Sequence, residues 1–315
     1  MCNNTSDQAT EFLLAGFPYL HGYQPGLFTM LLIIYFTILL GNALILIASV
    51  TVQKLHKPMY FFLCNLAVLD IIYTTSSIPK LLALLLFNVN NISFTACFIQ
   101  MCFSHTMGLF ESFLLMVMAY DRYVAICNPL HYSTIMNKQF NVHITASSFV
   151  AASVIIVALT IFTAHLPYTG SNIINHCFCD HFSIAKLACA DITLLVIWVM
   201  LIIVVLVLIP FSFVVFSYVN ILRAVLKMNS AVGRQKTFST CSSHLTVVVI
   251  YYISIVISFS SYRPGDVSDD FHALGTIFSA VFAPALNPVI YTLRNRDIQQ
   301  GIKTLIKAKT VAPKI

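Results

Sequence analysis

Seven apolar stretches of about 20 residues or more constrain this chain more than any other feature of its sequence. A helix of roughly 20 residues, rising about 1.5 Å per residue, crosses the hydrocarbon core of a bilayer, which is about 30 Å thick. The composition agrees, with 59% apolar and 9% charged residues, and excludes an ordinary soluble domain. The sequence therefore predicts an all-α membrane protein with seven transmembrane helices, over residues 26–51, 59–86, 97–127, 140–165, 194–226, 239–262 and 271–293.

Basic residues gather on one side of these helices. Lysines and arginines in short loops stay on the cytoplasmic side of a membrane, and here they follow the first, third, fifth and seventh stretches. The N-terminal segment lacks the basic start and apolar core of a cleavable signal peptide. We therefore predict an extracellular N-terminus over residues 1–25, a seven-helix domain over 26–293 and a cytoplasmic segment over 294–315.

Glycosylation sequons provide an independent check, because they are used only on the outer side. Three sequons fall on the predicted outer side, and they begin at Asn3, Asn4 and Asn91. A lone sequon is a weak motif, but their agreement with the charge pattern supports this orientation.

Four cysteines also fall on the outer side, where disulfides persist. They are Cys97, Cys177, Cys179 and Cys189. The alternative is a metal cluster of Cys177 and Cys179 with the flanking His176 and His181. Cys-x-Cys is a poor spacing for zinc, and extracellular cysteines usually pair, so the pattern favours disulfides and predicts no metal site.

Two carboxylates lie midway along predicted helices, where a charge is costly unless it is paired or functional. Asp70 and Glu111 are at similar depths and would repel each other, so either one of them takes up a proton or a small cation such as sodium lies between them. Asn287 is at a depth where it completes this cluster. A satisfied structural network of protonated acid and amide remains the alternative.

Two further motifs lie toward the predicted cytoplasmic side. Arg122 follows Asp121 at the end of the third stretch, and an ion pair there that can open is a plausible two-state latch. Pro288 removes a backbone hydrogen bond from the seventh helix and kinks it. A static kink is the simpler interpretation of this proline.

Helical spacing places several polar or small residues of the third stretch on one face, with His105 alongside. They are Ser104, Gly108, Glu111 and Ser112. A transporter or channel would also bury carboxylates, but the sequence has no internal repeat of interrupted helices. An intramembrane enzyme would need clustered catalytic groups or metal ligands, whereas the 10 histidines are scattered. We therefore predict no enzymatic activity.

Several motifs resemble those of the rhodopsin-like G-protein-coupled receptors and, more narrowly, the odorant (olfactory) receptors. The general resemblance rests on Gly41-Asn42, Asp70, Asp121-Arg122-Tyr123, Pro210 with Tyr218, and NPVIY at 287–291. The narrower resemblance rests on KPMYFFLCNLAVLD at 57–70, MAYDRYVAICNPLHY at 118–132, TFSTCSSHLTVVV at 237–249 and PALNPVIYTLRN at 284–295. KPMYFFL and TFSTCSSHL are similar to the larger, terrestrial (class II) branch.

This resemblance implies a receptor in olfactory neuron cilia that binds a small odorant and activates a stimulatory heterotrimeric G protein, raising cyclic AMP. It also implies a short amphipathic helix after the seventh helix. The implied ligand-binding residues are Ser104, His105, Gly108, Leu109, Ile202, Leu206, Tyr252, Ile255, Val256, Phe259 and Ile277, around a small apolar pocket with few polar groups. The implied residues for activation and coupling are Asp121, Arg122, Tyr123, Tyr218, Asn287, Pro288 and Tyr291.

One departure from the family pattern and one basic residue affect these expectations. LPYTG places Thr169 where the family usually has a cysteine. The implied bridges are therefore Cys97 with Cys179 and, as an alternative second bridge, Cys177 with Cys189. Arg263 stands near the outer end of the sixth helix, where it either holds a ligand carboxylate or pairs with nearby aspartates in solvent. We expect the second arrangement, and with it a neutral, apolar odorant.

Overall fold

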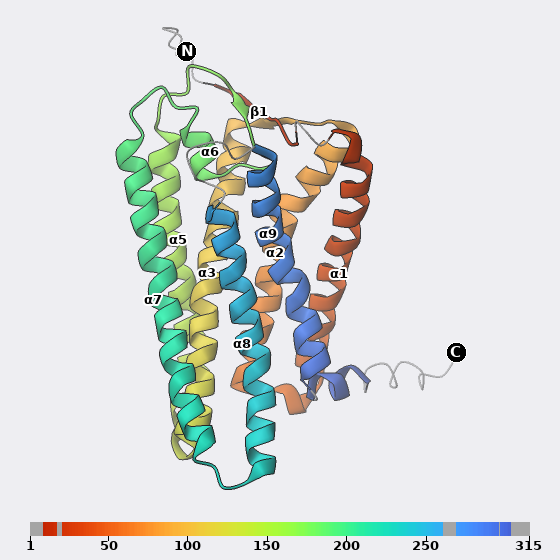
Figure 1. The fold of residues 1–315 in the computed structure, drawn as a ribbon, viewed down its shortest axis with the longest axis vertical. Coiled ribbons are helices and arrows are strands. Elements are labelled where there is room, and N and C mark those ends of the chain that lie inside the picture. Colours follow the sequence, from red (N-terminus) through yellow and green to blue (C-terminus); the bar gives the residue numbers. More distant parts are fainter. Residues whose placement is uncertain (1–8, 18–20, 261–268, 296, 304–315) are drawn as a thin grey trace, which may run out of the picture.

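The computed structural model describes residues 9–17, 21–260, 269–295 and 297–303. Seven of its helices are long and apolar enough to cross a membrane, which confirms the predicted fold class. They lie side by side as an upright bundle (Figure 1). Their bounds are Gln24–Thr51 (α1), Pro58–Phe87 (α2), Phe94–Cys127 (α3), Lys138–Ala164 (α5), Thr193–Leu226 (α7), Ala231–Ser260 (α8) and Asp269–Arg294 (α9).

Helix α8 begins at Ala231, eight residues before the transmembrane stretch that the sequence predicts over residues 239–262. Hydropathy marks only the part of a helix that lipid surrounds, whereas the polar sequence from Ala231 onward continues the same hydrogen-bonded helix. The other predicted bounds agree with the structure to within a few residues.

Helix α3 forms the centre of the bundle and packs against α2, α5, α7 and α8. Its middle is fully buried at Leu114, Leu115 and Ala119. The outer faces of α1 and α7 instead leave large apolar side chains exposed, such as Phe36 and Phe216. This distribution is that of a helix bundle whose surroundings are lipid rather than water.

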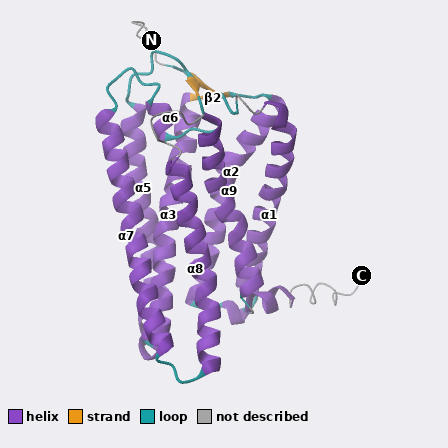
Figure 2. Cartoon of the chain, in the orientation of Figure 1, coloured by secondary structure: helices purple, strands orange, loops and turns teal. Residues whose placement is uncertain are grey.

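A small sheet closes one end of the bundle, the end predicted to face outward. Strand β1 (Glu11–Leu14) pairs antiparallel with β2 (Asn91–Ser93) and parallel with β3 (Ile173–Ile174), so that the order is β2-β1-β3. The strands lie above the helices at this end (Figure 2). Phe12 is fully buried there, against the rings of Phe94, Phe98 and Tyr168. The short helix α6 (His181–Ala185) lies beneath this sheet. We call this sheet, with α6 and the loop around it, the outer cap.

The opposite, inner end carries the short helix α4 (Tyr132–Ile135) and a helical segment over residues 297–303. This segment is held by Asp297, whose Oδ1 lies 2.9 Å from Nζ of Lys54. The hydroxyl of Tyr60 donates to Oδ2 of the same carboxylate over 3.2 Å. The hydrogen bond and charge of Lys54 hold the pKa of Asp297 below its ordinary value. The predicted short helix after the seventh is therefore present and docked.

Gly41 of α1 allows a close approach between two helices. A Cβ atom at this position would lie 2.8 Å from Cβ of Pro288, inside the proline ring's contact distance. Pro284 and Pro288 both interrupt the hydrogen bonding of α9. The resemblance motifs at residues 41–42 and 287–291 thus meet in one helix contact.

Candidate functional site

A cavity of about 210 Å³ lies in the outer half of the bundle. Helix α3 supplies one wall through Ser104, Gly108 and Glu111, which are spaced by about one turn each. The other walls come from α2, α5, α7, α8 and α9, and residues 178–180 of the outer cap close the top. We refer to it as the outer cavity.

The structure brings most of the expected α3 face to this cavity. The expected residues that line it are Ser104, His105, Gly108, Leu109, Glu111, Ser112 and, from α8, Ile255. The side chains of Ile202, Leu206 and Phe259, and the whole of Arg263, lie outside the part of the chain that the structure describes.

The remaining expected residues do not line the cavity. Val256 is 66% exposed on the outside of the bundle. Tyr252 packs its ring against Phe211 and shares a hydrogen bond with Ser112, at 3.2 Å between the two oxygens. Ile277 is buried in a separate apolar cluster between α1, α2 and α9.

The expected face of α8 is one residue out of phase. Tyr251, Ser254, Ile255 and Ser258 line the cavity, at spacings of three, one and three residues. A shift of one residue turns a helix by about 100°, so the set that begins at Tyr252 points partly to lipid. The sequence signal that identifies the correct face is the run of small hydroxyl residues at helical spacing.

The cavity is also more polar than expected. Six serines and one threonine line it, together with the carboxyl groups of Glu111 and Asp180. The polar groups are therefore more numerous than expected, although most of the surface of the cavity is apolar, as expected. A search for apolar helix faces alone does not find these residues. Serine is small enough to pack against either lipid or protein, so its position does not mark one face of a helix.

The disulfide between Cys97 and Cys179 is present and ties the top of α3 to the outer cap. It confirms the main implied bridge. Cys189 is also disulfide-bonded, but Cys177 is a free, buried thiol, so the alternative pairing of Cys177 with Cys189 is wrong. Burial raises the pKa of the Cys177 thiol well above its ordinary value.

Two histidines meet directly above the cavity. The ring of His181 lies edge-to-face on that of His105, with 4.8 Å between centroids, and its Nδ1 is 3.2 Å from Oγ1 of Thr163. Burial, and then the neighbouring His105, lower the pKa of His181 well below its ordinary value. Among the described residues, no group of three histidine, cysteine or acidic side chains is arranged to hold a metal ion.

Asp70 and Asn287 are joined in the middle of the bundle. Nδ2 of Asn287 donates to both carboxylate oxygens of Asp70, over 3.1 and 3.3 Å. Within the described part of the chain, Oε1 of Glu111 and Oδ1 of Asn287 are buried and accept no hydrogen bond. These oxygens are the kind of ligand that a small hard cation takes.

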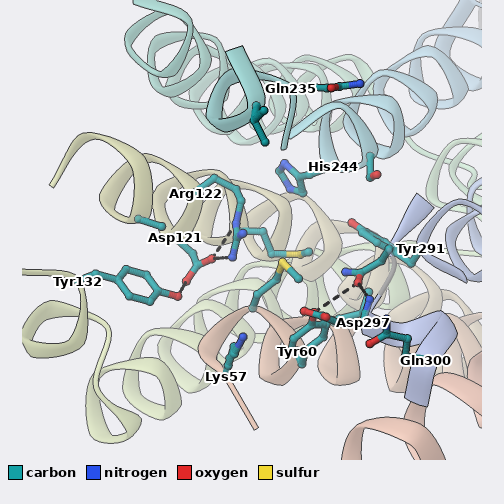
Figure 3. Close-up of a pocket in the computed structure, with 17 residues that line it drawn as sticks. Lys57, Tyr60, Asp121, Arg122, Tyr132, Gln235, His244, Tyr291, Asp297 and Gln300 are labelled. Atoms are coloured by element: carbon teal, nitrogen blue, oxygen red, sulfur yellow. Dashed lines mark hydrogen bonds and ion pairs between the residues drawn. The ribbon is translucent and has the colours of Figure 1, made fainter. Parts of the chain in front are cut away.

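A second cavity, of about 730 Å³, opens at the inner end, and we call it the inner cavity. Asp121 and Arg122 form an ion pair on its wall, with Nε of Arg122 2.9 Å from Oδ2 of Asp121 (Figure 3). On the other carboxylate oxygen, Asp121 accepts a 2.7 Å hydrogen bond from the hydroxyl of Tyr132. Burial and the charge of Asp121 raise the pKa of Tyr132, which keeps this donor protonated.

The opposite wall of the inner cavity comes from α8 and α9, and α7 lies against it through Tyr218. The hydroxyl of Tyr218 is 2.6 Å from Nδ1 of His244, and the two rings stack. His244 and Tyr291 both line the cavity and lie across from Arg122 in Figure 3. Tyr123 does not line the inner cavity and packs beside Tyr120 and against the apolar cluster of Ile221, Val225 and Cys241. Sequence reasoning missed Tyr132 and His244 as parts of this site, although both stand in the quoted motifs MAYDRYVAICNPLHY and TFSTCSSHL.

A seven-helix membrane bundle with an Asp-Arg-Tyr ion pair at one end and a ligand-sized cavity at the other defines the class, a rhodopsin-like G-protein-coupled receptor. The family model described as "Olfactory receptor" matches residues 31–309. The chain belongs to the olfactory receptor family.

Individual relatives are similar in sequence to this chain over nearly its whole length. Human olfactory receptor 2AT4 is 44% identical, over 97% of this chain and 95% of its own length. Human olfactory receptor 13D1 is 41% identical, over 94% of this chain and 86% of its own. Mouse olfactory receptor 10H28 is 42% identical, over 93% of each chain. These three relatives of the chain are thus olfactory receptors by name.

Proposed function

We propose that this chain binds a small odorant in the outer cavity and activates a stimulatory heterotrimeric G protein at the inner cavity, raising cyclic AMP. One observation carries the proposal: a single helix, α3, lines both cavities, through Ser104 in one and Arg122 in the other. These residues are 18 positions apart on that helix, or about 27 Å, so ligand and G protein do not touch.

Coupling between the cavities therefore requires a change of helix arrangement. The ligand favours the state to which it binds more tightly, and its differential affinity limits the shift. The contacts that hold the present arrangement at the inner end are the Asp121 pair with Arg122 and Tyr132, and the Tyr218 contact with His244. In the proposed active state these contacts open, and the inner cavity admits a segment of the G protein.

The experiment replaces the arginine of the ion pair. Arg122→Ala is expected to abolish odorant-dependent cyclic AMP while surface staining of the receptor stays near normal. Lys138→Ala is the matched control, because Lys138 is an exposed basic residue at the same end that does not line the inner cavity. A full cyclic AMP response in Arg122→Ala would overturn the proposal. Ion flux without cyclic AMP would favour a channel instead.

The polar cluster around Asp70 supports a second proposal, a sodium ion held by Asp70, Glu111 and Asn287. The unpartnered oxygens of Glu111 and Asn287 carry it. Sodium chloride is then expected to raise the melting temperature of the purified receptor above that in choline chloride, and Asp70→Asn to remove the difference. Equal melting temperatures in the two salts for the unmodified receptor would contradict the ion and leave a protonated network.

The location follows from the fold and the family. The chain is a multi-pass membrane protein, and we propose the plasma membrane of olfactory neuron cilia as its site, with Asn3, Asn4 and Asn91 glycosylated on the outer side. Asn91 is exposed in β2, where a glycan has room, whereas Asn3 and Asn4 lie outside the described residues. We assign no cofactor beyond the proposed sodium ion and no catalytic activity.

A further inference from the structure

Cys189 of the outer cap is disulfide-bonded, and its partner follows by elimination. Of the nine cysteines in the chain, Cys97 and Cys179 bond to each other. Five more are free thiols, namely Cys64, Cys102, Cys127, Cys177 and Cys241. No cysteine in the described part of the chain is left to pair with Cys189. The remaining cysteine of the sequence is Cys2, which lies outside the described residues.

The backbone brings the described start of the chain close to Cys189. The amide of Ala9 donates to the carbonyl of Tyr168 over 3.0 Å, and the amide of Cys189 donates to the carbonyl of Pro167 over 2.7 Å. Successive residues are about 3.8 Å apart, so Ala9 and Cys189 lie on the order of 10 Å from each other. Cys2 is seven positions before Ala9, and an extended chain of that length reaches about 23–25 Å. The distance is therefore well within the reach of Cys2.

The partner that the family usually supplies to Cys189 is missing from this chain. LPYTG has Thr169 where the family usually has a cysteine. Thr169 is two residues after Pro167, whose carbonyl binds the amide of Cys189. A cysteine at position 169 would lie close to Cys189, whereas threonine has no thiol to offer. A cysteine near the N-terminus supplies the missing sulfur from another part of the chain.

We infer that Cys2 and Cys189 form a second disulfide, which ties the N-terminal end of the chain to the outer cap. Each thiol loses a proton and an electron, and a sulfur–sulfur bond forms. The two protons and two electrons reduce the disulfide of an oxidoreductase in the secretory pathway to two thiols. Both cysteines belong to the predicted outer side, where disulfides persist.

The second bridge acts on the segment that closes the outer cavity. Cys179 and Asp180 line this cavity, and Cys179 is tied to α3 through Cys97. Cys189 is ten positions further along the same segment, which includes α6. The bridge to Cys2 holds this far end against residues 167 and 168. Loss of the bridge is expected to let this end move, so that the amides of residues 181–189 exchange their hydrogens with solvent faster.

The test is a peptide map of the purified full-length receptor under non-reducing conditions, with free thiols alkylated first. Cleavage after aspartate and glutamate releases residues 1–7, with Cys2 as their one cysteine, and residues 181–191, with Cys189 as theirs. After removal of N-glycans, we expect a species with the combined mass of the two peptides less two hydrogens, which separates into them on reduction. An alkylated Cys2, or a Cys189 linked to any other cysteine, would overturn the inference.

Single and double variants distinguish one shared bond from two unrelated thiols. Cys2→Ser and Cys189→Ser are each expected to lower the melting temperature of the purified receptor by about 5–10 °C, as loss of a native disulfide does. The double variant should fall no further, because both changes remove the same bond. Cys177→Ala is the matched control, since it removes a free thiol from the same cap. A double variant that falls by the sum of the two single changes would contradict the bridge, as would a Cys2→Ser receptor as stable as Cys177→Ala.

A cysteine at position 169 provides a rescue. In a Cys2→Ser receptor, Thr169→Cys is expected to bond to Cys189, to restore most of the lost melting temperature and to slow the hydrogen exchange of residues 181–189 again. A receptor that forms this bond and still melts at the lower temperature would attribute the effect of Cys2→Ser to something other than the bridge. These readouts are taken without odorant or G protein, so they do not depend on the proposed function.

Discussion

Tyr132 donates a 2.7 Å hydrogen bond to the carboxylate of Asp121, and so ties the loop helix α4 to the ion pair at the end of α3. The other oxygen of Asp121 is bound by Arg122. The carboxylate is thus held from two elements at once, and the side chain of Arg122 is kept against it rather than extended into the inner cavity.

Removing this hydroxyl is expected to loosen the inactive arrangement. Tyr132→Phe should raise cyclic AMP in the absence of odorant by about twofold to tenfold, because a hydrogen bond to a charged group is among the stronger ones. Tyr120→Phe is the control, since its ring packs in the same region but its hydroxyl makes no hydrogen bond with any described residue. Basal signalling that is the same in both variants would show that Tyr132 does not restrain the receptor.

Gly41→Ala is expected to destabilise the receptor by about 1–3 kcal/mol, as overpacking of a helix contact commonly does. The added methyl group would lie 2.8 Å from Cβ of Pro288, whose ring cannot rotate away. Gly26→Ala, on the same helix, meets no atom within 4 Å and should be tolerated. Melting temperature and surface staining measure both, and a Gly41→Ala receptor as stable as Gly26→Ala would refute the contact.

Loss of the disulfide should be distinguishable from loss of a thiol. Cys97→Ser and Cys179→Ser each break a bridge between residues 82 positions apart, and losing such a bridge costs about 2–5 kcal/mol, so both variants are expected to be retained inside the cell. Cys177→Ala removes only a free thiol and should reach the surface. Surface staining of all three variants, normalised to total receptor, measures whether the bridge variants are retained and the thiol variant is not. Normal surface levels of Cys97→Ser would contradict the expectation.

Acidification is expected to destabilise the outer cap through His181. The pKa of this buried histidine lies well below 6.5 in the folded receptor, so the unfolded chain binds a proton first as the pH falls. The stability is therefore complete above about pH 6.5 and declines below it. The groups that face His181 are His105, Asp180 and Thr163, of which Asp180 opposes the effect and His105 adds to it.

The measurement compares melting temperatures of the purified receptor at pH 7.5 and 5.5. His181→Asn cannot take up this proton and keeps a side-chain nitrogen near Thr163, so its melting temperature should fall less over the same interval. An equal fall in both receptors would assign the acid sensitivity to other groups.

The sequence predicts the seven helices well because hydropathy over about 20 residues depends only on local composition. The inner site was also largely predictable, since Asp121, Arg122, Asn287 and Tyr291 stand in motifs that contact one another in the fold. The contacts between helices, such as the approach of Gly41 to Pro288, are tertiary contacts. The family motifs imply them only indirectly.

The outer cavity was less predictable for a physical reason. Helices with apolar residues all round, such as α7, show almost no preferred apolar face, so the side that faces the cavity cannot be found from periodicity. On α8 this produced an error of one residue, so that the expected set included the exposed Val256 and left out Ser254, which lines the cavity. The outer sheet was not predicted at all, because β2 and β3 are only three and two residues long and acquire their structure from pairing with β1.

The pairing of β1 with β3 has a consequence for biosynthesis. Leu13 leaves the ribosome early, but its partner Ile173 is added about 160 residues later, which takes on the order of 8 to 30 s at ordinary elongation rates. The strand β1 lacks β3, and Phe12 lacks Tyr168, until the end of this interval, after four membrane helices have already been translated. The outer cap is therefore among the last parts of the first half of the receptor to close, and a nascent chain arrested before residue 173 would expose its N-terminal strand to chaperones of the translocation compartment.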